Sequence, residues 1–298
     1  MQLPTTEMLH DKAAGLDDLP LEDAALILLE GQAAAAQISP RVGLALQGAA
    51  QAMAQTISCG GTLYYVAAGS SALMAAADAM ELGGTFSIPA TQVRIIMAGG
   101  LPTSAEMPGE TEDGIAELAE GLSGLTATDT VITVSASGST PFTIEAASNA
   151  KRIGATIIGI ANNQGSPLLE AADHAIFLET PPEVVSGSTR LGAGTAQKIA
   201  LNTLSTLMAV ELGHIYDGMM VNLRADNEKL RGRALRIVGA IARVEEVEAA
   251  DALRASEGNV KLAVLIAAGA NGVAHANALL NDASGKLRPA LHQLENGN

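Results

Sequence analysis

The chain has 298 residues, with 17 Lys and Arg against 32 Asp and Glu, so its formal net charge at pH 7 is −15. It is 48% hydrophobic, which is enough apolar material for a folded core and excludes disorder over most of the chain. Because there is no basic surplus and only 2% of the residues are aromatic, we expect no nucleic-acid partner, duplex or single-stranded.

The cysteine and histidine content argues against disulfides and structural metals. The single cysteine, Cys59, cannot form an internal disulfide, and the five histidines are scattered without a zinc-like spacing. The N-terminus lacks the basic and apolar regions of a signal peptide. No apolar run reaches the ~18–20 residues that span a bilayer. We therefore expect a cytoplasmic protein with no membrane partner and no metal site.

The first part of the chain predicts an arm followed by two helices. Residues 1–20 are polar and mixed, as in an extended arm. An Ala/Leu-rich pattern then predicts a helix from Leu21 that Pro40 ends, and a second helix from about Arg41 to Ile57. A Gly-Gly pair at 60–61 ends that second helix. We assign residues 1–48 to an N-terminal arm and helix.

The middle of the chain predicts a parallel sheet. Short, almost continuously apolar runs alternate with helical stretches, which is typical of strands buried on both faces. The predicted strands are 62–66, 92–97, 130–134, 155–160 and 175–178. The fold class is therefore α/β, and we assign residues 49–223 to this domain.

The last third of the chain is predicted to be helical. A long helix is expected from Thr195, as its N-cap, to about Leu212, with Gly213 as the stop. A basic segment follows from Arg224 to Arg243, and residues 244–298 contain helical patterns but no convincing strand. We assign residues 224–298 to a small helical subdomain.

Small hydroxyl residues follow two of the predicted strands. Ser70 and Ser71 come after the first strand, and the segment 135–140 comes after the third, each just before a helix. Ligands of open α/β sheets bind at the carboxyl ends of strands, where backbone N–H groups and helix N-termini face outward. Neither loop has the spacing of a P-loop or of a dinucleotide-binding motif. Two such loops predict an anion site, although plain polar connections have the same composition.

A third hydroxyl-rich loop precedes the long helix at 186–195. Lys198 lies three residues into that predicted helix, where its charge opposes the helix dipole, which suggests contact with an anionic ligand. An ordinary surface lysine is the plainer alternative.

Two carboxylates stand out by position. Glu81 is predicted to end the helix that follows Ser71, just before Leu82-Gly-Gly84, and Glu112 lies in the loop 108–113. A partly dry pocket can raise the pKa of one carboxyl group enough for it to act as an acid, while a second carboxylate stays ionised and acts as a base. Solvated surface positions remain the alternative for both.

The motifs taken together resemble those of N-acetylmuramic acid 6-phosphate etherases. The segments that carry the resemblance are 5–8, 135–141, 163–167, 185–198, 201–206 and 222–231. The stretch 185–206 is specific to that family, whereas the serine loops alone are typical of any sugar isomerase (SIS) domain.

The resemblance implies a flavodoxin-like SIS domain with added helices, working as a homodimer on a phosphorylated amino sugar. Members cleave the D-lactyl ether of N-acetylmuramate 6-phosphate by elimination and then addition of water, without a metal or redox cofactor. The family's two catalytic glutamates match Glu81, as the acid, and Glu112, as the base. The expected phosphate and sugar contacts are Ser70, Ser71, Ser135, Ser137, Ser139, Thr140, Ser186, Ser188 and Lys198.

The chain departs from the family pattern around the expected sugar pocket. The differences fall at 67–73, 82–84, Ser139 and Gly192, where the family carries arginines, a Cys-Pro-Pro turn and a lysine. Two alternatives therefore stay open at this point: another SIS enzyme, such as an aldose–ketose isomerase of a phosphosugar, and a sugar-phosphate-binding regulator without catalysis.

Overall fold

The computed structural model describes residues 3–37, 42–107 and 116–297. The predicted stop at Pro40 and the predicted base Glu112 lie outside these ranges. The chain divides into two compact units, the first formed by residues 1–80 and 90–207 and the second by residues 81–89 and 208–298. Each unit is described separately below.

The first unit is built on a five-stranded parallel sheet, which confirms the predicted α/β class. The strands are β1 (Leu63–Ala67), β2 (Val93–Met97), β3 (Thr130–Ser135), β4 (Thr156–Ala161) and β5 (His174–Phe177). Their order across the sheet is β2-β1-β3-β4-β5, which is the flavodoxin-like order. In this order the chain reverses its direction of winding between β1 and β3, and the crevice at that switch point is where such folds bind ligands.

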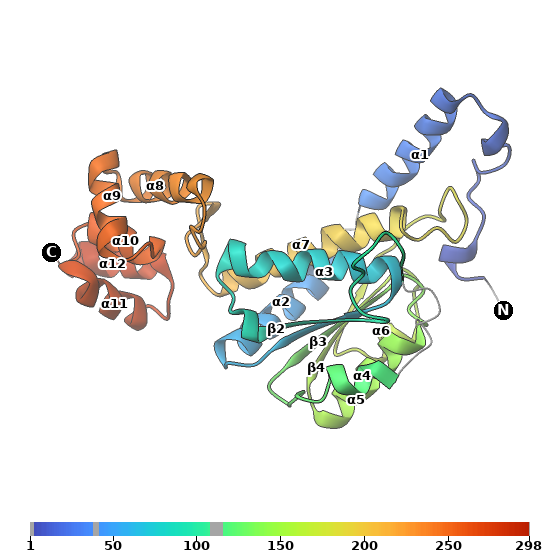
Figure 1. Cartoon of the computed structure of the whole chain (residues 1–298), viewed down its shortest axis with the longest axis horizontal. Helices are drawn as coiled ribbons and strands as arrows, with labels where there is room; N and C mark the ends of the chain where they lie inside the picture. Colours follow the sequence, from blue (N-terminus) through green and yellow to red (C-terminus); the bar gives the residue numbers. More distant parts are fainter. Residues whose placement is uncertain (1–2, 38–41, 108–115, 298) are drawn as a thin grey trace. The chain divides into compact units, whose positions relative to one another are not determined.

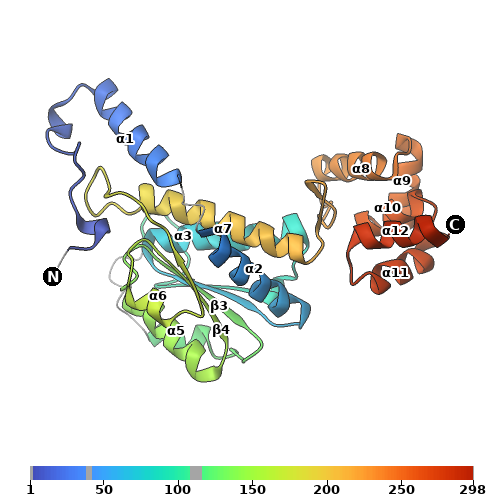
Figure 2. The same ribbon diagram turned by 180° about the vertical axis from the view of Figure 1, so that it is seen from behind.

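Helices cover both faces of the sheet, as Figures 1 and 2 show. One face carries α2 (Val42–Ser58), α3 (Gly69–Phe86) and α7 (Gly192–Glu211). The other carries α4 (Ala116–Gly121), α5 (Pro141–Ile153) and α6 (Pro167–Ala171). Because both faces are covered, β1 and β3 are buried along their whole length, which explains their largely apolar sequence.

Helix α3 runs further than its sequence predicts. It was expected to end at Glu81 before the Gly-Gly pair, but it continues through both glycines to Phe86. Neither glycine adopts a left-handed conformation. The last turn is held because the side chains of Leu82 and Phe86 are buried and because Asn222 Nδ2 donates a 2.9 Å hydrogen bond to the Phe86 carbonyl.

Helix α7 begins earlier than predicted. Thr195 is not its N-cap, because the helix starts at Gly192 and the Thr195 hydroxyl donates to Gln32 Oε1 at 2.6 Å. The first N–H groups are bound instead by the buried carboxylate of Glu183. It accepts hydrogen bonds from the amides of Gly192 at 2.9 Å and Ala193 at 2.8 Å. A carboxylate at this position also complements the helix dipole.

Glu183→Ala is expected to lower the free energy of unfolding by about 2–3 kcal/mol, because two buried N–H groups lose a charged acceptor. Urea unfolding followed by circular dichroism measures the change. Glu179→Ala is the matched control, since Glu179 is exposed in the same segment and should shift stability by no more than about 0.5 kcal/mol. Equal effects of the two variants would contradict the assigned cap.

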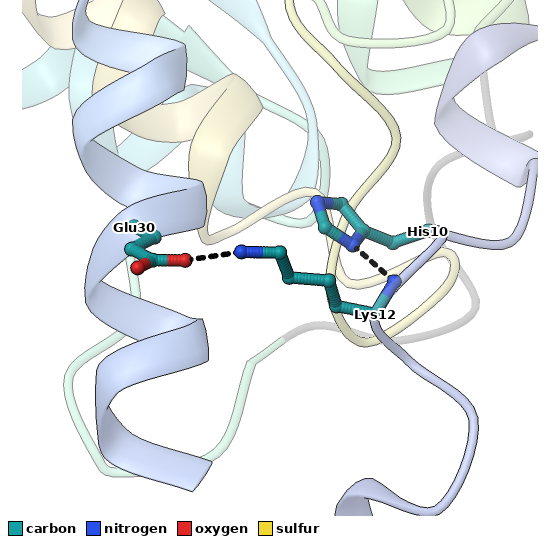
Figure 3. Close-up of polar contacts among 3 residues, drawn as sticks. All are labelled: His10, Lys12 and Glu30. Carbon is teal, nitrogen blue, oxygen red and sulfur yellow. Dashed lines mark hydrogen bonds and ion pairs between the residues drawn. The ribbon is translucent and has the colours of Figure 1, made fainter. Parts of the chain in front are cut away.

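The N-terminal arm contains two short turns, η1 (Thr5–Glu7) and η2 (Leu16–Asp18), before helix α1 (Leu21–Ala36). The arm is tied to α1 by an ion pair of 2.5 Å between Lys12 Nζ and Glu30 Oε2 (Figure 3). The Lys12 ammonium lowers the pKa of the Glu30 carboxyl. In addition, His10 Nδ1 accepts the Lys12 amide at 3.1 Å. Since both charges are exposed, this pair holds the arm only weakly.

The second unit is mostly helical, with a short antiparallel hairpin that the sequence did not predict. The hairpin pairs β6 (Ile215–Tyr216) with β7 (Met219–Met220). The helices are α8 (Glu228–Ala242), α9 (Glu246–Ala255), α10 (Val260–Ala267), α11 (Gly272–Asp282) and α12 (Leu287–Gly297). Among the described helices none is by itself long and apolar enough to cross a membrane, and only the sharply bent pair α10 and α11 meets that test together.

The second unit contains a buried lysine, Lys261, and a partly buried histidine, His214. Lys261 on α10 is 6% exposed, and its ammonium donates to the Gly285 carbonyl at 2.8 Å. Burial lowers the pKa of Lys261 to about 8. The pKa of His214 is lowered to about 4, first by burial and then by the charge of Lys261. His214 is therefore neutral at pH 7, whereas Lys261 still holds its proton there and loses it more readily than an ordinary lysine as the pH rises.

The buried lysine predicts a stability gain at alkaline pH. Between the folded pKa of about 8 and the ordinary value of 10.5, the unfolded chain holds the proton that the folded chain has released. Unfolding free energy should therefore rise by about 2 kcal/mol from pH 7.5 to 10. We expect Lys261→Met to remove this rise in urea titrations, and Lys229→Met, at an exposed position, to keep it. The same rise in both variants would contradict the assignment.

Candidate functional site

Two hydroxyl-rich loops lie beside each other at the switch point of the sheet. Strands β1 and β3 are neighbours in parallel register, with Ala67 opposite Val134. The loop after β1 leads into α3, and the loop after β3 leads into α5. Because parallel strands end at the same edge, the structure brings Ser70 and Ser71 to the same edge as the segment 135–140.

The loop after β1 offers backbone donors as well as hydroxyls. Ser70 is partly exposed and Ser71 is buried, and both lie in the first turn of α3. The first hydrogen bond inside this helix is donated by the amide of Ala72 to the Ala68 carbonyl. The amides of residues 69–71 come before this bond and form the N-terminus of the helix. N–H groups at such a terminus stabilise a bound anion.

The hydroxyls of the loop after β3 form one connected network. Ser135 Oγ lies 2.8 Å from Thr140 Oγ1 and 3.3 Å from Ser137 Oγ, and it accepts the Gly138 amide at 3.0 Å. Ser139 donates to Ser137 Oγ through its hydroxyl at 3.0 Å and its amide at 3.2 Å. Four of the predicted contact residues therefore lie in a single loop, with neutral donors suited to a phosphate.

Gly138 makes the fold of this loop possible. Its φ of +67° lies in the left-handed region that glycine adopts without strain. A Cβ at this position would come within 2.1 Å of Ser166 Oγ, 2.5 Å of Ser166 Cβ and 3.0 Å of Ala161 Cβ. The loop therefore packs tightly against the end of β4 and the start of α6.

Two residues that support this loop were not assigned a role from the sequence. The buried carboxamide of Asn163, beyond the end of β4, donates to the carbonyls of Ala136 and Ser137 at 3.3 Å each. It also donates to the hydroxyl of Thr6 in the N-terminal arm at 3.0 Å. A pair of asparagines just after a buried strand was the available signal for Asn163, whereas nothing near Thr6 in the sequence points to this contact.

The loop 186–188 holds the arm in place. Ser186 Oγ donates to the Glu7 carbonyl at 3.2 Å, and the amide of Gly187 donates to the Thr6 carbonyl at 3.3 Å. The side chain of Ser188 is only partly exposed. The structure therefore gives Ser186 a role in binding the arm, and it joins this loop to the carboxyl edge of the sheet through Thr6 and Asn163.

Lys198 is placed differently from its sequence interpretation. Since α7 starts at Gly192, Lys198 lies well past the first turn and is not in conflict with the helix dipole there. Its ammonium donates to Asn202 Oδ1 on the same helix. Asn202 in turn donates to Asp78 Oδ1 on α3 at 2.8 Å.

Asp78 is the centre of a buried network between α3, α7 and the sheet. It accepts the Tyr65 hydroxyl at 3.0 Å and the Ser205 hydroxyl at 2.8 Å, besides the Asn202 amide. Burial, followed by the charge of Asp78, raises the pKa of Tyr65 well above its usual range. The network connects α3 to α7 and to β1.

Glu81 itself is exposed on α3, inside the helix and not at its end. Glu112, the second predicted glutamate, lies outside the described residues. No group of three or more His, Cys, Asp and Glu within the described ranges could hold a metal ion. The chemistry of the described site is that of hydroxyls, amides and carboxylates.

Comparisons with known proteins agree with this geometry. A SIS domain family model matches residues 30–162. The chain is 40% identical to the N-acetylmuramic acid 6-phosphate etherase of Streptomyces avermitilis, over 96% of this chain and 93% of that protein. It is 38% identical to the etherase of Deinococcus radiodurans, over 97% and 96%. A solved structure of a candidate phosphosugar isomerase from Bacteroides fragilis shares the fold, with TM-score 0.53 and 20% identity over 67% of this chain and 95% of that one.

Proposed function

Because the chain belongs to the N-acetylmuramic acid 6-phosphate etherase family, we propose that it cleaves the D-lactyl ether of N-acetylmuramate 6-phosphate. The products are D-lactate and N-acetylglucosamine 6-phosphate. The observation that carries the proposal is identity near 40% over almost the whole length of the curated etherases, together with two hydroxyl loops at the switch point. Identity over the whole length favours the etherase over other SIS enzymes, which share only the fold.

The two loops suit the phosphate of the substrate. A chain with a net charge of −15 must bind a phosphate away from its own carboxylates. The hydroxyls of residues 135–140 and the free amides at the start of α3 are neutral donors, and the first turn of α3 contains no acidic residue. We assign the phosphate to this edge of the sheet.

The proposed reaction is a lyase reaction followed by hydration. In the open-chain sugar the C2 proton is acidic because it lies next to the aldehyde, and we assign Glu112 as the base that removes it. The C2–H electrons form the C2–C3 double bond as the C3–O bond breaks. Lactate leaves with the proton that Glu81 supplies, and water then adds at C3. Each acid or base of this kind contributes about 10²–10⁴-fold.

We place the reaction in a homodimer. Helix α1 supports a second copy, because Ala35 is its only buried residue while Leu21, Leu26 and Leu29 are 88%, 56% and 65% exposed. Apolar side chains gathered on one helix in this way are typical of a protein–protein contact. Light scattering during gel filtration measures the mass and should give twice that of the 30.2 kDa chain.

The deciding experiment is product identification. The purified protein is incubated with N-acetylmuramate 6-phosphate, and D-lactate is measured enzymatically beside mass analysis of the sugar. We expect equal amounts of D-lactate and N-acetylglucosamine 6-phosphate. A ketose phosphate without lactate would show an isomerase, and thermal stabilisation by the sugar phosphate without any turnover would show a binding protein.

A further inference from the structure

The N-terminal arm is anchored by one buried polar residue. Among residues 3–20 only Thr6 is buried, with 3% of its surface exposed. Its hydroxyl accepts a hydrogen bond of 3.0 Å from Asn163 Nδ2, beyond the end of β4. By contrast, Leu3 and Leu9 of the arm are 64% and 76% exposed. The arm is therefore attached here by a directional polar contact and not by the burial of its leucines.

The carboxamide of Asn163 also holds one peptide unit of the hydroxyl loop 135–140. Asn163 Nδ2 lies 3.3 Å from the Ser137 carbonyl, which has no other donor in the part of the chain that the structure describes. The N–H of the same peptide unit belongs to Gly138 and donates to Ser135 Oγ at 3.0 Å. Because a peptide unit is planar, any turn of the carbonyl also turns the N–H. The hold on this carbonyl therefore also sets the place of the Ser135 hydroxyl, one of the expected phosphate contacts.

The carboxamide has more acceptors around it than hydrogens to give. Its nitrogen carries two hydrogens, yet it faces Thr6 Oγ1 at 3.0 Å and the carbonyls of Ala136 and Ser137 at 3.3 Å each. At the other end of the group, the buried Asn163 Oδ1 has no donor among the described residues. The bond to Thr6 is the shortest of the three, and nothing fixes the oxygen side. Thr6 therefore gives the carboxamide its firmest hold.

Backbone contacts keep Thr6 in this place. The amide of Gly187 donates to the Thr6 carbonyl at 3.3 Å. The hydroxyl of Ser186 donates to the carbonyl of the next residue, Glu7, at 3.2 Å. Since the turn η1 is bound at several points, Thr6 leaves Asn163 only when this part of the arm comes away. The position of the arm and the geometry of the hydroxyl loop are therefore connected.

We infer that Thr6 and Asn163 are positioning residues of the phosphate site, so that the docked arm and the bound phosphosugar stabilise each other. This coupling rests on the proposed function, because it requires that the loop 135–140 binds the phosphate. The arm need not touch the sugar, since its effect passes through Asn163 to the Ser137 peptide unit. The coupling is reciprocal: a ligand that is bound more tightly with the arm docked must also favour the docked arm, by the same factor.

Thr6→Val tests the role of the hydroxyl, because it keeps the shape of the side chain. We expect the KM for N-acetylmuramate 6-phosphate to rise about 3–10-fold, the worth of one neutral hydrogen bond, with kcat nearly unchanged. Thr6→Ser keeps a hydroxyl and should restore the parent KM. Thr5→Val, at a partly exposed neighbour, is the matched control and should also leave KM unchanged. A parent KM in Thr6→Val, or the same rise in Thr5→Val, would overturn the inference.

A double variant shows whether the two residues act through each other. Asn163→Ala should raise KM by at least as much as Thr6→Val, because the Ser137 carbonyl then loses its donor. Adding Thr6→Val to Asn163→Ala should have no further effect, since the residue through which Thr6 acts is already gone. Multiplied effects in the double variant would mean that Thr6 acts by another route, which contradicts the coupling.

Proteolysis of the arm tests the coupling without relying on turnover. Trypsin cuts after Lys12, whose side chain is 57% exposed, and it needs an extended segment, so the cleavage rate reports how often the arm comes away. Saturating N-acetylglucosamine 6-phosphate should slow release of the peptide 1–12 about 3–10-fold in the parent chain and not in Thr6→Val. Inorganic phosphate is the second probe, because the loop is assigned to the phosphate group itself.

The outcomes of this experiment separate the coupling from the proposed reaction. Equal cleavage rates of the parent chain with and without both probes would overturn the inference, as would equal protection in Thr6→Val. Slowed cleavage in a parent chain that releases no D-lactate would refute the etherase proposal and support the coupling of the arm to the phosphate site.

Discussion

Glu81→Gln is expected to release D-lactate at least 10²-fold more slowly than the parent chain, with little change in stability. The glutamine keeps the size of the side chain but cannot donate a carboxylic proton to the departing lactate alkoxide. Glu81 is exposed, so its replacement disturbs no buried contact. The expected loss is therefore in kcat, with KM for the phosphosugar nearly unchanged, because the phosphate is bound by other residues.

Glu295→Gln provides the matched control, because Glu295 is an exposed glutamate on α12 and its replacement removes the same charge as Glu81→Gln does. It should keep the parent rate. Glu112→Gln should show a loss of the same order as Glu81→Gln, because it removes the base. If Glu81→Gln raised KM and left kcat intact, the acid role would be wrong and a binding role would replace it. Equal thermal melting of all the variants checks that they are folded.

Gly138→Ala is expected to destabilise the first unit by about 2–5 kcal/mol and to abolish binding of the sugar phosphate. A left-handed φ costs an alanine about 1–2 kcal/mol. The methyl group also meets Ser166 at 2.1 Å and 2.5 Å, and relief of such a clash costs about 1–3 kcal/mol more. Urea unfolding gives the stability, and calorimetric titration with N-acetylglucosamine 6-phosphate, the expected product, gives the binding.

Gly165→Ala separates the two causes. Gly165 has the same φ of +67°, but a Cβ there would meet nothing within 4 Å. This variant should lose only the ~1–2 kcal/mol of backbone strain and should keep its ligand affinity. Similar losses in Gly138→Ala and Gly165→Ala would mean that strain, and not the packing of the loop on Ser166, is what the alanine disturbs.

The order of strands and hydroxyl loops follows from local sequence alone. A strand such as 130–134 is recognised from the spacing of apolar residues within a few positions, because this spacing differs from that of the helical stretches on either side. Hydroxyls directly after such a strand must lie at its carboxyl end, which is why Ser71 and Ser135 could be predicted at one edge of the sheet. Fold class and the place of the candidate site therefore needed no tertiary information.

The ends of two helices were predicted wrongly, because contacts with distant residues decide them. The Gly-Gly pair after Glu81 was a plausible stop, but the burial of Phe86 and the hydrogen bond from Asn222 carry α3 past it. Thr195 was a plausible N-cap, but the carboxylate of Glu183 binds the amides of an earlier turn. Glycine and threonine have only weak local preferences, and a buried contact outweighs them.

The sequence by itself determined which elements form and which side chains lie at the ends of the strands, because these depend on neighbours within a few residues. Only the tertiary structure decided that Thr6 reaches Asn163, that Asp78 joins α3 to α7, and that α3 continues past Glu81 to Phe86. These facts join residues far apart in the chain, or depend on a helix running past its expected end. Spacing in the sequence does not reveal the contacts responsible, since they are set by how the whole chain packs.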